Sequence, residues 1–299
     1  MTHRSCLAGV TVGDGLDVAI VGVLNVSPES FYAGSVLTSA DGLVRAAEAM
    51  VVAGAAFLDV GAMSTAPYLS GRISATEEAD RLASAVSVLA GKIGVPISAD
   101  TSRAMPARAA LESGAGIIND VTGLVGDPAM GAIVARAGAG LIAMVSETPA
   151  AREEPPAQSA AVLRDPIDDV SARLRGALAL AHRVGISDDA IVLDPGIGFF
   201  RRGGMQWHER DVAVLSGLGR LRALGRPICV GVSRKSFIGA LTGEGDPGRR
   251  LPGSLAATTV AVLGGAHMIR THDVAETVQA VRVAEAVRAR ATSGKGSPP

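Results

Sequence analysis

Aromatic residues are scarce in this chain of 299 residues, which contains five Phe, two Tyr and one Trp. Its core must therefore be built from Val, Leu, Ile and Ala, which suit parallel strands that are covered on both faces. Lysine is also scarce, with three lysines against 25 arginines. Because arginine is the default cation here, Lys235, which follows a fully apolar segment, becomes a candidate for a role that needs a compact ammonium group.

Cysteine and an excess of one charge are lacking as well. Cys6 and Cys229 are far apart and share no Cys/His spacing, which argues against a disulfide framework or a metal site and favours a cytoplasmic setting. The net charge is −1 with no basic run, so nothing indicates nucleic acid or an anionic membrane as a partner. No apolar run approaches the roughly 18 residues that a membrane span needs. The N-terminal segment lacks a continuous apolar stretch, which argues against a signal peptide.

Short apolar runs alternate with longer helical patterns along most of the chain. The predicted strands are Val18–Leu24, Ala55–Val60, Val95–Ala99, Gly116–Ile118, Ala139–Val145, Ala190–Leu193, Pro227–Val232 and Ala266–Arg270. The predicted helices are Asp41–Ala53, Thr76–Gly91, Ala104–Ser113, Pro128–Ala137, Arg164–Val184, Glu209–Leu224, Leu251–Leu263 and Val274–Arg290. Eight strand-then-helix units predict an α/β fold of the (β/α)8 TIM-barrel type. A doubly wound sheet is the main alternative, but its usual GxGxxG turn is missing after the first strand.

The predicted organisation has three parts. Residues 1–17 are expected to form a short N-terminal hairpin or plug, with Gly13-Asp14-Gly15 as turn material. Residues 18–290 are expected to form the barrel, and residues 291–299 a disordered tail. Glu147–Asp165, which is rich in Pro, Ala and charge, is expected to be a long loop after the fifth strand.

Polar residues follow nearly every predicted strand. The C-terminal ends of barrel strands converge on one mouth, where active sites lie. The residues concerned are Asn25, Asp59, Asp100, Thr101, Asn119, Asp120, Asp194, Ser233, Arg234, Lys235, Arg270 and His272. Each has a simpler interpretation alone: Asp59 and Asp100 would cap the next helix, Asn119 would bridge strands, and His272 would start the last helix. Their coincidence on one rim is harder to explain by capping and predicts an active site.

Five segments of the chain resemble dihydropteroate synthase, a pterin-binding enzyme. They are Gly22–Phe31; Asp100–Thr101 with Gly116–Val121; Leu193–Phe199; Gly231–Gly239; and Gly253–Ala257 leading into Arg270–Val274. No single segment would suffice, but their order and spacing make the resemblance to this family strong. The resemblance implies an enzyme of folate biosynthesis that joins 6-hydroxymethyl-7,8-dihydropterin pyrophosphate to an arylamine, ordinarily 4-aminobenzoate, and releases pyrophosphate.

The resemblance also implies roles for individual residues. Asp194 would accept two N–H donors of the pterin edge, a pairing that makes carboxylate contacts specific. The full set implied to bind pterin is Asp100, Asn119, Met144, Asp194, Phe199, Lys235 and Arg270. The set implied to bind the arylamine and the pyrophosphate is Asn25, Thr65, Ser236, Arg270 and His272. Catalysis is implied for Asn25, Asp100, Lys235, Arg270 and His272.

Mg²⁺ is the implied cofactor, with Asn25 as its protein ligand, because a metal ion offsets the charge of a pyrophosphate leaving group. The implied partners are small-molecule substrates. Family members are commonly dimers, so a homodimer through the helices of the last units is expected.

The chain departs from the family pattern in three places. After Phe31 the usual Ser-Asp-Gly-Gly is replaced by a segment containing Ala33, so an acidic residue is absent. In the second loop, Met63 and Ala66 stand where the family has glutamate and arginine. After the fifth strand, Ala143 stands where the family has histidine, which is expected to remove a histidine from the rim. Loss of an arginine from a phosphate clamp removes a charged, two-pronged contact.

These departures leave several interpretations open. In the first interpretation, the chain is a synthase in which other cations compensate, for example Arg72, Arg201 or Arg202. In the second, it is a synthase for a larger arylamine, as in methanopterin-type pathways. In the third, it is a paralogue that binds pterin without catalysis. Pterin-dependent methyl transfer on the same barrel is a fourth interpretation, against which the Ser233–Ser236 segment argues.

Overall fold

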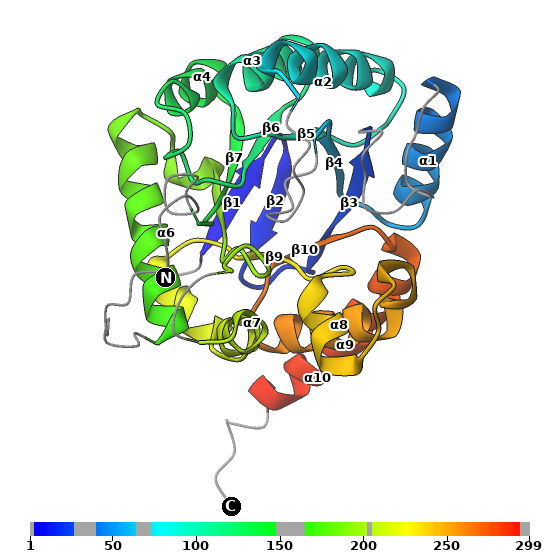
Figure 1. The fold of residues 1–299 in the computed structure, drawn as a ribbon, viewed down its shortest axis with the longest axis vertical. Helices are drawn as coiled ribbons and strands as arrows, with labels where there is room; N and C mark the ends of the chain where they lie inside the picture. The colour runs from blue at the N-terminus through cyan, green and yellow to red at the C-terminus, as the bar shows by residue number, and fades with distance from the viewer. Residues whose placement is uncertain (1–2, 27–39, 64–72, 148–164, 202–204, 294–299) are drawn as a thin grey trace, which may run out of the picture.

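The computed structural model describes residues 3–26, 40–63, 73–147, 165–201 and 205–293. A ring of parallel strands is surrounded by helices, which confirms the predicted (β/α)8 barrel (Figure 1). The barrel strands are β3 (Ala19–Asn25), β4 (Phe57–Gly61), β5 (Ile97–Asp100), β6 (Ile117–Asp120), β7 (Gly140–Met144), β8 (Ile191–Asp194), β9 (Cys229–Gly231) and β10 (Met268–Thr271). Each overlaps one of the eight predicted strands.

The strands follow the order β8-β7-β6-β5-β4-β3-β10-β9. A single bridge between Leu193 and Ile228 joins the two edge strands, and the Leu193 N–H donates to the Pro227 carbonyl at 3.0 Å. Parallel neighbours require crossover connections, which the helices supply. They are α1 (Ala40–Val52), α2 (Ala75–Leu89), α3 (Ala104–Glu112), α4 (Met130–Ala137), α6 (Pro166–Arg183), α7 (Trp207–Ser216), α8 (Ser236–Thr242), α9 (Leu251–Leu263) and α10 (Val274–Ser293).

One helix prediction was wrong in detail, and one helix was not predicted. The segment Glu209–Leu224 is not one helix: α7 ends at Ser216 and a 3-10 helix, η3 (Leu218–Leu224), follows. Gly217 separates them, and a Cβ there would lie 3.2 Å from Ile167 Cβ, so the junction is set by packing against α6. The helix α8 was not predicted, because seven residues span too few turns to show a helical period.

The N-terminal hairpin consists of β1 (Arg4–Leu7) and β2 (Val10–Gly13), which pair antiparallel. Its turn is formed by Ala8 (φ 47°) and Gly9 (φ 90°), the positive angles that a two-residue hairpin favours. Gly13-Asp14-Gly15, predicted as turn material, also lies at a turn, in which the Leu16 N–H donates to the Gly13 carbonyl at 3.3 Å. This turn follows the hairpin and leads the chain into β3.

The barrel interior is layered along its axis. Its lower layer is apolar and includes two residues of the hairpin; it consists of Leu7, Val12, Val21, Phe57, Ile117, Ile142, Val192, Cys229 and Met268. Because side chains alternate along a strand, the residue two positions later faces inward as well. On four strands that residue is polar, namely Asp59, Asn119, Asp194 and Arg270. The hairpin and the apolar layer thus form the floor beneath a polar layer.

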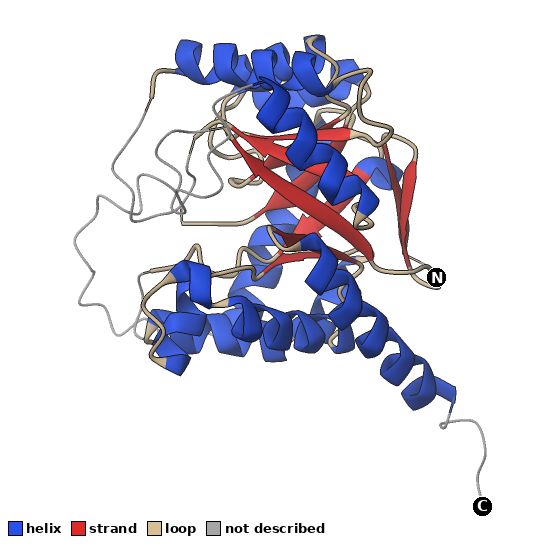
Figure 2. Cartoon of the chain, turned by 90° about the vertical axis from the view of Figure 1, so that its right-hand side faces the viewer, coloured by secondary structure: helices blue, strands red, loops and turns tan. Residues whose placement is uncertain are grey.

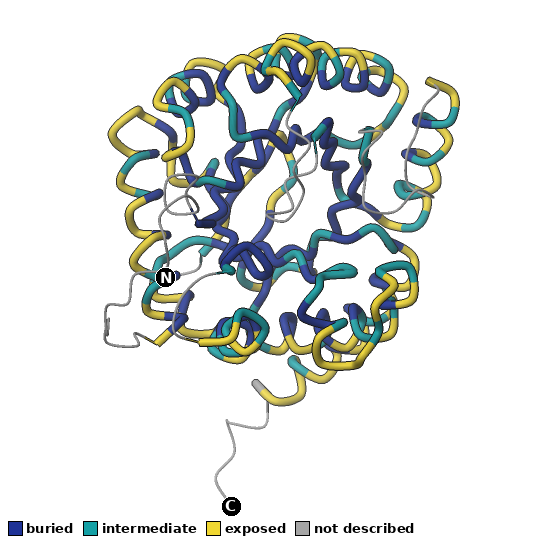
Figure 3. The backbone as a smooth tube through the Cα atoms, viewed as in Figure 1, coloured by how far each residue is buried: buried dark blue, intermediate teal, exposed yellow. Residues whose placement is uncertain are grey.

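The outward faces of the strands pack against the helices and form the larger part of the core. Figure 2 shows the strands lying between the helices. Figure 3 shows the buried strands inside a ring of helices whose outward-facing residues are exposed. The helix α10 runs to Ser293 and so includes the first residues of the predicted tail, whereas residues 294–299 and most of the predicted loop Glu147–Asp165 lie outside the described residues. None of the described helices is long and apolar enough to span a membrane.

The buried hairpin contact generates a stability prediction. Leu7 is 0% exposed in the barrel floor, so Leu7→Ala is expected to lower the free energy of unfolding by about 2–5 kcal/mol, as measured by urea unfolding. Leu241→Ala is the control, because Leu241 is 58% exposed and its loss should change stability by no more than about 0.5 kcal/mol. Equal effects of the two changes would contradict the plug role of the hairpin.

Candidate functional site

A pocket opens at the C-terminal ends of the strands. It is lined by Asp100, Asn119, Val121, Met144, Asp194, Ile197, Phe199, Gly231, Lys235 and Arg270. The structure therefore brings together all seven residues of the set that the resemblance assigned to pterin. Sequence reasoning missed Val121, Ile197 and Gly231 as lining residues, although each lies inside or at the start of a motif segment.

Arg270, on β10, is held between two carboxylates. Its Nε donates to Asp59 Oδ2 at 2.5 Å and its Nη2 donates to Asp100 Oδ2 at 2.6 Å. Asp59 is fully buried, so it does not cap a helix as its simpler interpretation supposed; Ser74 caps α2 instead. Asp59 was among the polar residues predicted at the rim, but no binding or catalytic role was assigned to it.

Asn119 is oriented by the same buried carboxylate. Its Nδ2 donates to Asp59 Oδ2 at 2.9 Å, which leaves its amide oxygen as the group available to a ligand in the pocket. The site therefore offers an acceptor at Asn119 and selects a ligand that presents an N–H or O–H donor there. This contact joins β6 to β4, which are separated by β5, so Asn119 does not bridge neighbouring strands as its simpler interpretation supposed.

Asp100 carries a perturbed carboxyl group. Burial raises its pKa, Arg270 lowers it and Asp59 raises it further, so that the pKa reaches about 7. Its Oδ1 is buried without a hydrogen-bond partner among the described residues. Near neutral pH this group is divided between its two protonation states and is able to donate to a ligand or accept from one. It does not cap α3, since Asp127 accepts the Ala104 N–H at 2.8 Å.

Asp194 ends β8 at a tight turn. The Gly196 N–H donates to Asp194 Oδ1 at 2.8 Å. Gly196 has φ 68°, and a Cβ there would lie 1.8 Å from the Val145 carbonyl oxygen, so only glycine fits this position. Burial raises the pKa of Asp194 to about 6 against the opposing effects of this hydrogen bond and of Lys235. The carboxylate is therefore ionised at neutral pH.

The Lys235 side chain lines the pocket with its ammonium group over an aromatic ring. Its Nζ lies 4.0 Å from the centroid of Phe199, a cation–π contact. Gly198 lies against the lysine chain, since a Cβ there would be 3.0 Å from Lys235 Cδ, and the buried Asp211 holds Gly198 by accepting its N–H at 2.8 Å. Burial, with the repulsion of Arg270, lowers the pKa of Lys235 to about 8.

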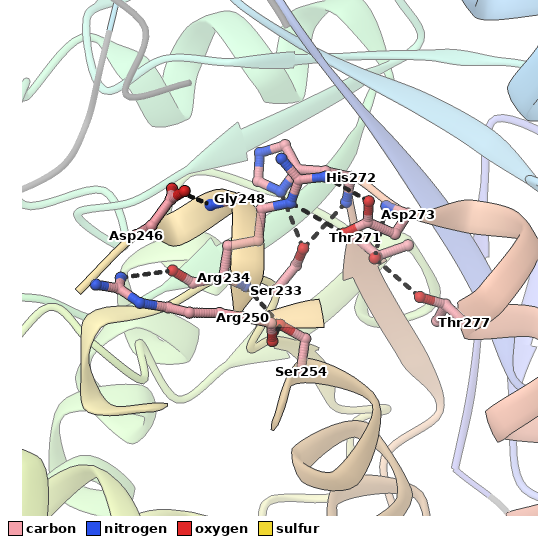
Figure 4. A network of polar contacts seen from close by, with 10 residues as sticks. All are labelled: Ser233, Arg234, Asp246, Gly248, Arg250, Ser254, Thr271, His272, Asp273 and Thr277. Atoms are coloured by element: carbon pink, nitrogen blue, oxygen red, sulfur yellow. Dashed lines mark hydrogen bonds and ion pairs between the residues drawn. The ribbon is translucent and has the colours of Figure 1, made fainter. Parts of the chain in front are cut away.

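The turn that delivers Lys235 passes through a left-handed residue, Arg234, with φ 58°. A network shown in Figure 4 holds this conformation. Ser254 Oγ accepts the Arg234 N–H at 2.8 Å, and Arg250 donates to the Arg234 carbonyl at 3.2 Å. The Arg234 guanidinium donates to Asp273 at 3.0 Å. Since a left-handed non-glycine residue is costly, these contacts explain why the segment around Ser254 accompanies the lysine segment in the sequence.

His272 lies beside this network (Figure 4). Ser233 Oγ accepts the His272 backbone N–H at 3.3 Å and lies 3.0 Å from His272 Nδ1. If the hydroxyl donates to Nδ1, the proton of the neutral imidazole is on Nε2; if Nδ1 donates to the hydroxyl, Nε2 is an acceptor. Burial and the nearby Arg270 and Arg234 lower the pKa of His272 to about 3. This side chain is therefore neutral at physiological pH rather than positively charged.

The second predicted set is only partly within the described residues. Asn25 ends β3 at the rim and is half-exposed, and Gly61 leaves room beside it, since a Cβ there would lie 3.6 Å from Asn25 Oδ1. Ser236 follows Lys235, and its Oγ accepts from Arg201 Nη2 at 2.6 Å. Thr65 lies outside the described residues.

The departures from the family pattern also lie partly within and partly outside the described residues. Ala33 and Ala66 lie outside the described residues, and Met63 is half-buried just after β4. Ala143 is 1% exposed and packs in the core between the strands and the helices, whereas its neighbour Met144 lines the pocket. The expectation that Ala143 removes a histidine from the rim was therefore wrong, because alternation along β7 turns this position away from the mouth.

A metal site made by the protein alone is not found in the described part of the chain, where no group of three or more His, Cys, Asp or Glu residues is placed to hold an ion. Asn25 contributes one neutral amide oxygen at the rim. This donor set fits Mg²⁺ in the way the ion usually binds with phosphates, through one or two protein oxygens, phosphate oxygens and water.

The chain is similar to known proteins over nearly its whole length. Residues 21–272 match the model of the family described as pterin binding enzyme. Dihydropteroate synthase from Mycobacterium leprae is 40% identical over 271 residues, covering 89% of this chain and 92% of that protein. A structure of Yersinia pestis dihydropteroate synthase with a sulfonamide drug has a TM-score of 0.83 at 32% identity, covering 96% and 99% of the two chains. The Xanthomonas albilineans enzyme in complex with 7,8-dihydropteroate has a TM-score of 0.78 at 31% identity, covering 99% and 100%.

The charge of Asp59 generates a prediction for its neighbour. In Asp59→Asn, the pKa of Asp100 is expected to fall from about 7, because the repulsion from Asp59 raises it in the native chain. The carboxyl carbon shift of Asp100 in an NMR titration measures this. Asp189→Asn, on the exposed surface before β8, is the control and should leave the titration of Asp100 unchanged. An unaltered pKa in Asp59→Asn would show that the two carboxylates are not coupled.

Proposed function

The chain belongs to the family of pterin-binding enzymes, and we propose from this premise that its barrel mouth carries out the dihydropteroate synthase reaction of folate biosynthesis. It joins 6-hydroxymethyl-7,8-dihydropterin pyrophosphate to an arylamine, 4-aminobenzoate, and releases pyrophosphate. The observation that carries the proposal is the pocket in which Asp100, Asn119, Asp194, Lys235 and Arg270 meet.

The polarity of the pocket suits a pterin ring. The ionised Asp194 accepts two N–H donors of the amidine-like edge, and the amide oxygen of Asn119 accepts a third. Lys235 donates to the acceptor atoms of the ring, and Asp100 serves either as donor or as acceptor. The apolar residues that line the pocket contact the remaining ring surface; they are Val121, Met144, Ile197 and Phe199.

The reaction needs no protein nucleophile. The arylamine nitrogen attacks the methylene carbon, the bond from that carbon to the pyrophosphate oxygen breaks, and the electron pair leaves with pyrophosphate. The new ammonium group then loses a proton to water or to the released pyrophosphate. The protein contributes positioning and charge: Arg270 and, in the tautomer with its proton on Nε2, His272 stabilise the leaving group, while the pterin pocket holds the carbon toward the amine.

Mg²⁺ is proposed to bind at Asn25 with the phosphates of the substrate, where it would supply positive charge to the leaving group. Thr65 stays a prediction for binding the arylamine and the pyrophosphate. Ser236 is proposed to meet the carboxylate of the arylamine, and its position directly after Lys235 at the mouth supports this role.

Because the loops differ from the family pattern, two alternatives to the ordinary synthase remain. They are a synthase for a larger arylamine acceptor and a paralogue that binds pterin without turnover. One observation favours the ordinary synthase: Arg201, one of the cations expected to compensate, lies at Ser236. The other two, Arg72 and Arg202, lie outside the described residues.

We also propose that the chain forms a homodimer and works in the cytoplasm. Four exposed apolar side chains on the adjacent helices α9 and α10 support the first proposal; they are Val260, Leu263, Val283 and Val287. Burial of such a surface between two copies would remove it from water. The second proposal is supported by the two cysteines, which are both unpaired thiols.

The activity is tested with purified protein, Mg²⁺ and the two substrates. Pyrophosphate release is expected only when the pterin pyrophosphate and 4-aminobenzoate are both present, and the product should be dihydropteroate by mass spectrometry. Turnover with a larger, phosphoribosylated arylamine alone would assign the acceptor to the methanopterin type. Tight pterin binding by calorimetry without any turnover would assign a binding paralogue and overturn the synthase proposal.

Asp194→Asn tests the pterin contact. The change replaces an acceptor by an amide that presents a donor to the N–H edge of the ring, so the affinity for 6-hydroxymethylpterin should fall by at least about 100-fold. Asp80→Asn, on the exposed face of α2, is the control and should bind normally by calorimetry. Unchanged pterin affinity in Asp194→Asn would show that the pocket is assigned wrongly.

The pKa values of the pocket predict a pH optimum for pterin binding. Protonation of Asp194, with a pKa of about 6, removes its acceptor, so affinity falls as the pH drops below that value by about tenfold per unit. Deprotonation of Lys235, with a pKa of about 8, removes its charge, so affinity also falls above that pH. Calorimetry from pH 5 to pH 9 measures both limbs. Lys235→Met should lose the alkaline limb and keep the acid limb; a flat profile in the native chain would contradict both assignments.

A further inference from the structure

Arg201 brings a cation to the mouth of the pocket that pterin recognition does not use. It lies two residues after Phe199, which lines the pocket. Its Nη2 donates to Ser236 Oγ at 2.6 Å, and Ser236 directly follows Lys235. The pair Arg201 and Ser236 therefore lies next to Phe199 and Lys235, two residues that line the pocket.

The position of Arg201 is braced from two sides. Its guanidinium carbon lies 4.0 Å from the ring centroid of Trp207 on α7, and tryptophan is the aromatic residue that binds cations best. Its backbone N–H donates to Glu147 Oε1 at 2.7 Å, which ties the segment to the end of β7. The charge is thus held at a defined place by contacts that do not depend on a bound ligand.

The chemistry of this pair matches a carboxylate. Because the Ser236 oxygen accepts from Arg201, its own hydroxyl hydrogen is directed elsewhere and is able to donate to a ligand. A carboxylate that approaches the pair meets a hydroxyl donor and a fixed guanidinium charge, and charge-assisted contacts of this kind are the strong ones. A neutral acceptor with an amide or ester in the same place gains little from the cation.

We propose that Arg201, acting with Ser236, selects the arylamine acceptor by its carboxylate and so determines that the enzyme uses an anionic acceptor rather than a neutral one. This inference rests on the proposed synthase function. The charge comes from the segment after β8.

Steady-state kinetics with Arg201→Gln and Arg201→Lys test the proposal. For 4-aminobenzoate, Arg201→Gln should raise KM on the order of tenfold or more, because one charge-assisted contact is lost, and Arg201→Lys should restore part of the loss. KM for the neutral 4-aminobenzamide and KM for the pterin pyrophosphate should stay unchanged in both variants. An equal loss with the acid and the amide would overturn the proposal, since it would show that Arg201 only supports the loop.

Arg210→Gln is the matched control. Arg210 also stacks on an aromatic ring, with its guanidinium carbon 4.4 Å from the centroid of Phe200, and it pairs with Asp169 at 2.7 Å. It does not contact Ser236 in the described contacts. The control should have the native ratio of kcat/KM for 4-aminobenzoate to that for 4-aminobenzamide; a change in this ratio as large as that of Arg201→Gln would overturn the assignment to Arg201.

A binding measurement separates this inference from the proposed function. Trp207 is the only tryptophan of the chain and lies against Arg201, so its fluorescence should change when 4-methylbenzoate binds, with and without 6-hydroxymethylpterin. The change should be lost in Arg201→Gln and absent with 4-methylbenzamide. If the native chain shows no turnover but keeps this response, the synthase proposal fails and the carboxylate site stands. If neither the response nor the kinetic selectivity depends on Arg201, the carboxylate site fails.

Discussion

Asp59 is the buried charge on which the arrangement of the site depends. It is fully buried at the centre of the barrel, and it holds Arg270 by an ion pair and Asn119 by a hydrogen bond. Through these contacts it decides that Asn119 presents an oxygen and that Arg270 stays between Asp59 and Asp100. Removing one partner of such a group leaves an uncompensated charge in a dry interior, so the three side chains act as one unit.

The apolar floor makes this buried charge tolerable. The hairpin residues Leu7 and Val12 close the bottom of the barrel beneath Phe57 and Ile117, which keeps water away from the polar layer on that side. In such surroundings an electrostatic contact is stronger than in water. The same exclusion of water raises the pKa of Asp100 and Asp194 and lowers that of Lys235. The hairpin therefore supports the site without contacting a ligand.

Strands and turns contribute to different halves of the reaction. The residues proposed to bind pterin lie mostly at strand ends, where the ladder of parallel strands holds them rigidly. Lys235 and Ser236 instead depend on the left-handed Arg234 and its network with Ser254. Acceptor recognition, assigned to Ser236 and Arg201, depends on connections after strands, and the departures from the family pattern at Ala33 and Ala66 also fall in such connections. In this chain the proposed pterin-binding residues thus match the family motifs, whereas Ala33 and Ala66 depart from them in connections after strands.

The sequence by itself determined the barrel, through its eight strand-then-helix units, and the pterin set, through the resemblance of its motifs to pterin-binding enzymes. The layers of the barrel agree with the alternation along the strands, as in Ile117 and Asn119 or Met268 and Arg270. It did not reveal that Asp59 orients its neighbours, that Ala143 faces away from the mouth, or that His272 is neutral. Those facts depend on which atoms lie within about 3 Å of one another across the barrel. Arg201 was visible only as one of several cations in a loop, and tertiary packing against Trp207 and Ser236 decided its place. Burial and long-range contact set the direction of a hydrogen bond and the pKa of a group, and neither is written in the order of residues along the chain.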